Sequence, residues 1–489
     1  MTIAKGGDDP SAAIGRSNHM LARLSQRMVD LAERWFPDAY VFVLIATVLV
    51  AGGALLHGGT PLAVSRAFGD GFWNLVPFTM QMAFVAIGGY VVAMSPPAAM
   101  LLHRLARVPS GGRSAIVFIG VLSILLSLLN WGLSLIFSGL LAREIAARRD
   151  LRLDYRAAGA ASYLGLGCGF TLGVTSSAAQ LQANAASIPA SLLPITGVIG
   201  FSETILTWQN GVVIVVVILV SAAICYFTAP APDEVKTAED LGVTLHHDHD
   251  HDHAEVVTPH ARPGDYLENS PVLTLLIVLL ASGWIWYTFS SGNPLITLSG
   301  LNTYNFVFLL LGMLLHWRPR SLVGAFSKAM PSVSGVLLQF PFYAGIAQVL
   351  TKVHNADGAT LSDAIAHWFV GVSTSATAFS IFVGIYSAVL GFLVPSAGGK
   401  WVIEAPYVMT SANEVGAHLG WTVMVYNITE TLPNLLNPFW MLPLLGILGL
   451  KSKDLIGYTS VQFFIHFPIV LILAAVLMST FTYHPPVLP

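Results

Sequence analysis

Long runs of apolar residues, separated by short polar or basic segments, occupy the chain from about residue 40 to its end. Several runs reach the ~20 residues that an α-helix needs to cross a bilayer. The pattern predicts uninterrupted spans at Tyr40–Leu56, Pro77–Met94, Gly211–Phe227, Pro271–Phe289, Tyr304–His316, Val333–Leu350 and Phe463–Met478. The sequence therefore predicts an all-α polytopic membrane protein.

Four further apolar runs are interrupted by polar, glycine or proline residues. The runs are Ala115–Ile145, Ala157–Leu193, Phe379–Met409 and Trp421–Ile447. Their interruptions, which we call the four breaks, are Asn130–Gly132, Gly173–Ser177, Pro395–Trp401 and Asn427–Asn434. Backbone groups left unpaired at membrane depth are tolerated only where protein buries them or where they line a watery cavity. The four breaks are therefore the first candidates for a functional site.

Basic residues flank Ala115–Ile145 on both sides, with Arg113 before it and Arg148 after it. Positively charged loops stay on the cytoplasmic side, so this run should enter the membrane and return to the same side. We expect a re-entrant hairpin with its tip at Asn130–Gly132. Phe379–Met409 is expected to form a second hairpin, and the other two interrupted runs are expected to be broken helices.

The predicted elements recur in the same order in two halves. Two spans, a hairpin, a broken helix and a span precede a polar linker, and the same series begins again at Tyr304. The extra span Pro271–Phe289 makes the second series start from the opposite side of the membrane. This arrangement is an inverted repeat with about nine transmembrane helices, and its substrate site is expected at the membrane midplane between discontinuous helices.

The repeat and the composition divide the chain into segments. Residues 1–37 form a cytoplasmic N-terminus, in which apolar residues at steps of three and four from Leu21 to Trp35 predict an amphipathic helix. Both a position on the membrane surface and packing on the bundle agree with this helix. The remaining segments are the first membrane repeat (38–228), a cytoplasmic His-rich linker (229–270), a connecting span and loop (271–303) and the second, inverted repeat (304–489).

The basic residues support this topology. With the N-terminus in the cytoplasm, Arg66 and Lys352 fall outside and Lys400 falls within the membrane, and the rest of the 23 Lys and Arg residues are cytoplasmic. The first long apolar run begins only near Ala39. We therefore expect no cleavable signal peptide, and the first span should itself direct insertion.

Composition narrows the class of protein further. The 489 residues are 55% hydrophobic and 10% charged, a balance that excludes a soluble globular protein of this length. The net charge of −3 says little about partners, and Cys168 and Cys225 lie far apart in apolar segments, which suggests neither a disulfide nor a metal site. No nucleotide-binding loop, nucleophile–base arrangement or nucleic-acid patch is evident. We expect a protein that is not an enzyme, needs no cofactor and binds no nucleic acid.

The four breaks supply groups that suit a small anion and a cation. Helix N-termini offer N–H groups and partial positive charge to a carboxylate, and freed carbonyls and hydroxyls can coordinate a cation. One isolated break is more often a kink closed by packing, but four at matching places favour a site. The predicted substrate-binding residues are Asn130, Trp131, Gly132, Thr175, Ser176, Ser177, Ser396, Gly398, Gly399, Lys400 and Trp401, and the predicted coupling-ion residues are Thr429, Glu430 and Asn434.

Lys400 lies within a break, and an ionisable residue inside a membrane segment is a candidate for function. Three roles stay open: contact with an anionic substrate, occupation of the place of a coupling cation, and a structural ion pair with Glu404 or Glu430. Glu430 is in turn a candidate proton carrier or cation ligand, and equally a structural partner for Lys400.

The linker contains a run of histidines alternating with aspartates: His246, His247, His249, His251 and His253. Such a run binds Zn²⁺, Ni²⁺ or Cu²⁺ adaptably but has no defined ligand spacing. An incidental solvated run is the simpler interpretation. The alternatives it raises are a divalent metal cation transporter and a metal-responsive membrane protein, although the spans contain no cluster of His, Asp and Glu at helical spacing.

Several stretches resemble the bacterial short-chain fatty acid transporters, the acetoacetate/butyrate permease group of the ion-transporter superfamily. These stretches are Phe68–Leu75, Phe78–Ala83, Asn130–Gly132 with Ala142–Glu144, Gln339–Ile346, Pro395–Tyr407 and Asn434–Trp440. The resemblance is collinear over about residues 20–480, and the combination of stretches is specific.

The resemblance implies uptake of short-chain monocarboxylates such as acetoacetate or butyrate across a bacterial inner membrane, by symport with H⁺ or Na⁺. It also implies a scaffold, a moving transport domain and a homodimer. Two departures from the family pattern leave the substrate and the coupling ion open. Gly173–Ser177 replaces a Gly-Gly-Ser-Gly-Ser-like stretch, and Lys400 stands where a neutral or histidine side chain is common. The His-rich linker is also foreign to the family pattern.

Overall fold

The computed structural model describes residues 39–245, 262–291, 297, 300–373, 375–394, 396–437 and 439–488. The amphipathic helix expected within 1–37, the histidine run of 246–253 and Pro395 lie outside the described residues. Within the described ranges, the secondary structure is helical apart from isolated bridges between Gly197 and Val487 and between His354 and Thr360. The prediction of an all-α protein is confirmed.

The helices fall into a first half, a connection and a second half. The first half contains α2 (Ala39–Leu56), α3 (Pro61–Gly71), α4 (Val76–Ala93), α5 (Pro96–Leu105), α6 (Gly112–Leu129), α7 (Trp131–Ala146), α8 (Tyr155–Ser162), α9 (Ser177–Ala183) and α11 (Trp208–Thr228). The connection contains α12 (Pro263–Asn269) and α13 (Val272–Ser290). The second half contains α15 (Leu301–His316), α16 (Pro319–Ala329), α17 (Ser334–Lys352), α18 (Leu361–Val372), α19 (Ala376–Leu393), α20 (Ala397–Val415), α21 (Leu419–Glu430), α22 (Leu442–Leu448) and α23 (Ser452–Met478).

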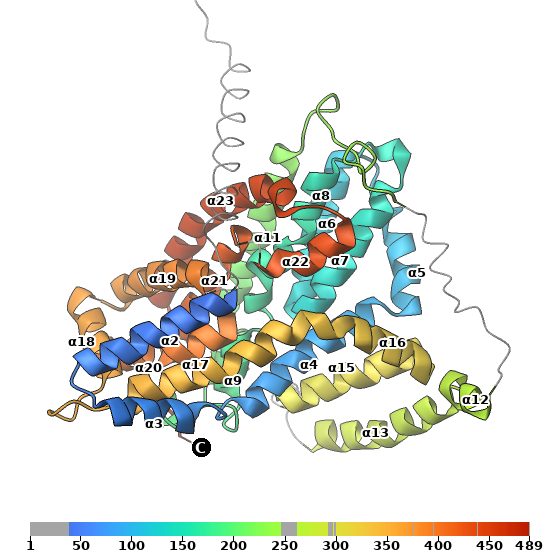
Figure 1. Cartoon of the computed structure of the whole chain (residues 1–489). Helices are drawn as coiled ribbons and strands as arrows, with labels where there is room; N and C mark the ends of the chain where they lie inside the picture. Colours follow the sequence, from blue (N-terminus) through green and yellow to red (C-terminus); the bar gives the residue numbers. More distant parts are fainter. Residues whose placement is uncertain are drawn as a thin grey trace, which may run out of the picture.

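The two halves share one order of elements. Each has a long, a short, a long and a short helix, followed by a hairpin, a broken helix and a final long helix (Figure 1). The apolar pattern predicted this order without the short helices α3, α5, α16 and α18. Their start signals are local: Pro61, Pro96 and Pro319 stand in the first turn, and Thr360 forms a capping box with Asp363.

Several helices are suited to a bilayer. Among the described residues, seven helices are long and apolar enough to cross a membrane, or up to eight if the bent pair Leu419–Leu435 and Phe439–Leu448 is one span. Tyr40–Leu56, Leu301–His316 and Ala376–Phe392 are apolar but shorter. The chain is therefore a multi-pass membrane protein.

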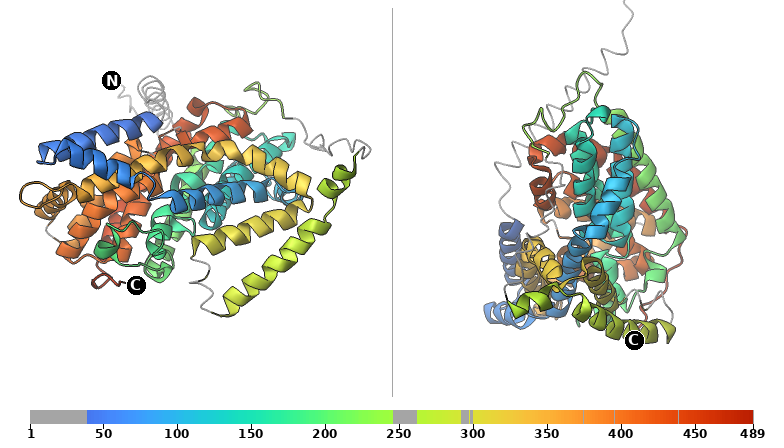
Figure 2. Two further views of the ribbon diagram at one scale, coloured as in Figure 1. Left: turned by 60° about the horizontal axis from the view of Figure 1, so that its bottom comes forward. Right: turned by 90° about the vertical axis from the view of Figure 1, so that its right-hand side faces the viewer.

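The helices form two layers (Figures 1 and 2). One layer contains α2, α3, α4, α15, α16 and α17, with α13 on its outer side, and the other contains α6, α7, α8, α11, α19, α22 and α23. α20 packs on α17 of the first layer and on α9. α13 is exposed along most of its length, and its Leu279 and Trp286 side chains are 72% and 78% exposed. An apolar helix exposed to this extent is suited to contact with lipid.

In the first layer, helices of the two halves pack on one another. α2 of the first half packs on α17 of the second, and α15 of the second half packs on α4 of the first. The rings of Tyr40 and Phe342 lie edge to face at 5.3 Å between centroids. Gln81 Nε2 donates to Asn302 Oδ1 at 2.8 Å, and Asn305 Nδ2 donates to the Gln81 carbonyl at 2.8 Å. The two hairpins pack on this layer, through contacts of α7 with α4 and of α20 with α17.

Candidate functional site

Residues of all four breaks line one cavity. Trp131, Ser177 and Asn434 each come from a different break, and Ser396 with Gly398 comes from the tip of the second hairpin. The cavity volume is about 50 Å³, room for a few water-sized groups. The structure thus brings together, at one place, residues that are up to about 300 positions apart in the sequence.

The rest of the lining is mostly apolar and comes largely from α4, α17 and the segments next to the breaks: Met82, Leu166, Phe170, Gly335, Val336, Gln339, Phe340, Ala397, Phe439 and Trp440. Phe340 stacks on Phe78 with ring centroids 5.8 Å apart, and Trp131 meets Trp440 edge to face at 5.7 Å. None of the described lining residues carries a charge. The cavity therefore presents aromatic walls with a few neutral polar groups.

Asn130 builds the tip of the first hairpin. Its Oδ1 accepts the Leu133 N–H at 2.9 Å and so caps α7, while its Nδ2 donates to the Val85 carbonyl at 2.9 Å and to Tyr304 Oη at 3.0 Å. A Cβ at Gly132 would lie 2.8 Å from the Ala86 carbonyl oxygen, which explains the glycine. Asn130 is thus buried in the contact with α4 and α15, and Trp131 is the residue of this tip that reaches the cavity.

Ser396 builds the tip of the second hairpin in the same way. Its Oγ accepts the Gly399 N–H at 3.3 Å and caps α20. A Cβ on Gly398 would lie 3.0 Å from Ser177 Cβ, so this tip touches the first broken helix. A Cβ on Gly399 would overlap the ring of Tyr343. Gly398 faces the cavity, whereas Gly399 packs against α17.

The first broken helix is interrupted between Leu172 and Ser177. Ser176 caps α9 by accepting the Ala179 N–H at 3.5 Å, and Ser177 lines the cavity. The Thr175 hydroxyl is buried without a hydrogen-bond partner among the described residues. A buried hydroxyl oxygen in this position is available to a ligand or a cation.

The second broken helix is interrupted after Glu430. The Thr429 hydroxyl donates back to the Val425 carbonyl at 2.8 Å, so it is used within α21. Asn434 Oδ1 and both carboxylate oxygens of Glu430 are buried and have no hydrogen-bond partner in the part of the chain that the structure describes. The backbone carbonyl of Asn434 accepts the Tyr163 hydroxyl at 3.1 Å, which ties this break to the first broken helix.

Lys400 is buried inside the second hairpin and is not among the cavity-lining residues. Its Nζ lies 2.7 Å from Glu404 Oε1 and donates to the Ser387 carbonyl at 3.0 Å. Ser387 Oγ donates to the other Glu404 oxygen at 2.6 Å. The ammonium also lies 4.3 Å from the ring centre of Tyr426. Of the partners considered for Lys400, Glu404 makes the direct ion pair.

Two predicted residues lie behind the cavity wall. Trp401 is fully buried and packs on Tyr426 with centroids 4.6 Å apart. Glu430 interacts electrostatically with Lys400 and Glu404, but among the described residues it makes no ion pair with Lys400. The charged groups therefore form a buried cluster next to the cavity, separate from its lining.

Sequence reasoning missed the contribution of α17. Gln339 and Phe340 line the cavity, and the Tyr343 hydroxyl donates to Gln339 Oε1 at 3.1 Å. A signal was present, because Gln339 is a polar residue in an apolar span, two positions before Pro341, which lies inside the helix. Phe439 and Trp440 were missed because they follow the break Asn427–Asn434 and do not belong to it.

The sequence matches one transporter family and two bacterial proteins named after it. A family model described as "Short chain fatty acid transporter" matches residues 20–478. A protein named "Putative short-chain fatty acid transporter" from Escherichia coli (strain K12) is 34% identical over 446 residues, which cover 90% of this chain and 96% of that protein. A protein of the same name from Haemophilus influenzae is 28% identical over 459 residues, which cover 93% and 99%.

Two solved structures have a similar fold. MtrF of Neisseria gonorrhoeae, described with a class of antimetabolite efflux pumps, has a TM-score of 0.59 and 14% sequence identity, with 95% of this chain and 99% of that chain covered. The YdaH transporter of Alcanivorax borkumensis, described as having an unusual topology, has a TM-score of 0.55 and 16% identity, with 91% and 98% covered. At these identities the likeness concerns the fold alone.

Proposed function

Since the chain belongs to the short-chain fatty acid transporter family, we propose that it takes up short-chain monocarboxylates, such as acetoacetate or butyrate, across the bacterial inner membrane by secondary active transport. The cavity at the four breaks is the observation that carries this proposal. Its aromatic walls and few polar groups suit one small molecule with an apolar chain and a polar end.

The carboxylate of the substrate is expected at the helix starts. Trp131 and Ala397, the first residues of α7 and α20, both line the cavity. The first amides of a helix have no intrahelical partner, and the helix N-terminus carries partial positive charge. Two such N-termini therefore favour a carboxylate, while Met82 and Phe340 offer apolar contact to the acyl chain.

The uncharged lining explains why a cation would accompany the substrate. Transfer of a carboxylate into a dry, uncharged site costs several kcal/mol unless a positive charge goes with it. The buried oxygens of Thr175 and Asn434 are candidate ligands for Na⁺. The Glu430 carboxyl, which has no hydrogen-bond partner among the described residues, is the candidate proton carrier. Because Lys400 is already paired with Glu404, it leaves Glu430 available for this role.

The order of elements supports alternating access. We interpret the two halves as inverted repeats with re-entrant hairpins and about nine transmembrane helices, because α13 places one extra crossing between them. The N-terminus is then cytoplasmic, in agreement with the basic loops. The layer of α2, α3, α4, α15, α16 and α17 would serve as the scaffold, and the hairpins and broken helices would move against it.

Uptake of radiolabelled butyrate and acetoacetate into proteoliposomes tests the proposal. We expect accumulation above the external concentration when an H⁺ or a Na⁺ gradient is imposed, and no accumulation under either gradient would overturn it. Zn²⁺ uptake in the same vesicles is the control for a metal cargo, because the described lining contains no His, Cys, Asp or Glu.

Two variants separate the coupling ions. Thr175→Val, which replaces the hydroxyl group with a methyl group of similar size, should abolish uptake driven by Na⁺. Glu430→Gln, which cannot exchange a proton, should abolish uptake driven by H⁺ and leave exchange of labelled for unlabelled substrate intact. If neither variant changes uptake, the assignment of the coupling site is wrong.

A further inference from the structure

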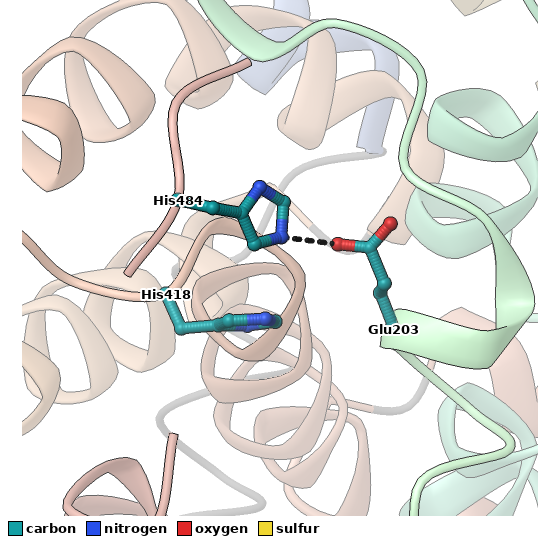
Figure 3. Close-up of side chains that lie close together, drawn as sticks. All are labelled: Glu203, His418 and His484. Carbon is teal, nitrogen blue, oxygen red and sulfur yellow. Dashed lines mark hydrogen bonds and ion pairs between the residues drawn. The ribbon is translucent and has the colours of Figure 1, made fainter. Parts of the chain in front are cut away.

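Glu203, His418 and His484 bring potential metal-binding atoms together away from the cavity (Figure 3). One donor atom from each of the three side chains lies within 4.8 Å of the other two. The residues come from the loop before α11, the start of α21 and the C-terminal tail. We infer that they form a binding site for one divalent transition metal ion of the Zn²⁺ class.

The backbone around each residue holds its side chain in place. A Cβ on Gly420 would lie 2.9 Å from Glu203 Cβ, so the loop packs closely on the first turn of α21. The tail is fixed on the same loop, because the Val198 N–H donates to the Val487 carbonyl at 2.9 Å. The ring of Phe481 in the tail stacks on His418 with centroids 4.5 Å apart.

Hydrogen bonds select which imidazole nitrogens are available. His418 Nδ1 accepts the Trp421 N–H at 3.0 Å, which leaves Nε2 as the donor atom for a metal. His484 Nδ1 lies 3.0 Å from the Pro485 carbonyl oxygen, and Nε2 lies 2.8 Å from Glu203 Oε2. Because both nitrogens of His484 face acceptor oxygens, the Nε2 side needs a positive partner, either a proton or a metal ion.

Two imidazoles and one carboxylate are a ligand set that Zn²⁺ uses, with water in the fourth position. Donor atoms around tetrahedral Zn²⁺ are about 3.3 Å apart, so small side-chain movements would close the site. The His484 and Glu203 side chains are 41% and 30% exposed, which leaves a path for the ion.

The site is separate from the transport cavity. His418 caps the start of α21, whereas the second broken helix is interrupted at the other end of this 12-residue helix, about 18 Å along its axis. A bound metal ion would join the C-terminal tail to the loop of the first half and to α21 of the second half. Its expected effect is to fix the tail, and it is not a cargo site.

Metal binding can be measured on the purified full-length protein by competition with a chromophoric Zn²⁺ chelator. The five histidines of the 246–253 run are replaced by Asn, and the purification tag contains no histidine, because both would bind Zn²⁺. We expect one Zn²⁺ per chain, and a tetrahedral absorption spectrum when Co²⁺ replaces it. We also expect slower amide hydrogen exchange in residues 479–488 when Zn²⁺ is present.

Three variants test the ligands, and one serves as control. Glu203→Gln, His484→Ala and His418→Asn should each weaken Zn²⁺ binding by about 100-fold or more. Asn at 418 retains a side-chain acceptor for the helix cap, so its effect reports the lost ligand. His367→Ala is the control, since His367 is exposed and lies 4.0 Å from Glu414. The inference is overturned if Zn²⁺ does not bind, or if all three variants bind it as the parent does.

Discussion

The two hairpin tips use the same local construction. A polar cap, Asn130 or Ser396, starts the returning helix, the next residue lines the cavity, and a glycine follows that. The glycines, Gly132 and Gly398, allow close contact with a neighbouring segment. Both tips reach the same cavity with the residue that follows the cap, Trp131 or Ala397.

The interiors of the hairpins differ. Four and eight residues after the cap, the first hairpin has Ser134 and Ser138, whereas the second has Lys400 and Glu404. Ser134 Oγ donates to the Ser123 carbonyl at 2.6 Å, and Lys400 Nζ donates to the Ser387 carbonyl at 3.0 Å. A neutral hydrogen bond in one half is thus matched by a buried ion pair in the other.

This difference separates two roles. The first tip is fixed to α4 and α15 by the hydrogen bonds of the Asn130 side chain to Val85 and Tyr304. The second tip places charge beside Glu430, whose carboxylate has no hydrogen-bond partner among the described residues. We therefore expect disruption of the second hairpin to impair transport more than disruption of the first.

Gly399→Val should abolish uptake while expression is retained. Any Cβ at this position overlaps the Tyr343 ring, so the tip must move away from the cavity. The corresponding position in the first hairpin is Leu133, and Leu133→Val is therefore the matched control, with uptake retained. Proteoliposome uptake and membrane expression levels check this pair. Normal uptake kinetics in Gly399→Val would show that transport does not require glycine at position 399.

Lys400→Gln should destabilise the protein by about 3–5 kcal/mol, because it leaves the buried Glu404 carboxylate without its cation. The double variant Lys400→Gln/Glu404→Gln should recover most of this loss. Ser134→Ala, the counterpart in the first hairpin, should cost only about 1 kcal/mol. Unfolding in detergent measures all three variants. Equal stability of Lys400→Gln and the parent would contradict a structural ion pair.

Asn130→Ala should destabilise the protein by about 2 kcal/mol, since it removes a helix cap and the hydrogen bonds that Asn130 Nδ2 donates to the Val85 carbonyl and to Tyr304 Oη. Ser396→Ala should cost less, about 1 kcal/mol, because Ser396 serves mainly as a cap. The difference between the two losses in the free energy of unfolding measures what the additional hydrogen bonds of Asn130 contribute to stability. Equal costs in an unfolding experiment would argue against the proposed division of roles.

Deletion of His246–His253 should have the smallest effect. The run belongs to the polar linker between the two halves, and none of the described cavity-lining residues comes from it. Uptake should therefore stay within about twofold of the parent. Proteoliposome uptake provides the measurement. Loss of uptake in a correctly folded deletion variant would instead support a metal-dependent function of the linker.

The sequence determined the features that depend on near neighbours. Apolar runs of membrane length predicted the long helices, and polar or glycine residues within such runs marked the four breaks, because backbone hydrogen bonding is local in a helix. The caps Asn130 and Ser396 follow from the same rule, since a cap bonds to an amide three residues away. Lys400 and Glu404, four residues apart on α20, also lie on one face of that helix.

Only the tertiary structure decided which side chains share a space. Gln339 and Phe340 line the cavity because α17 packs there. The polar Gln339 and the nearby Pro341 mark this part of the span in the sequence, but they do not indicate which cavity it faces. Glu203, His418 and His484 meet only because the tail folds back over two distant segments. The physical reason is that contacts between helices depend on packing over the whole chain, whereas periodicity, caps and breaks report only the nearest few residues.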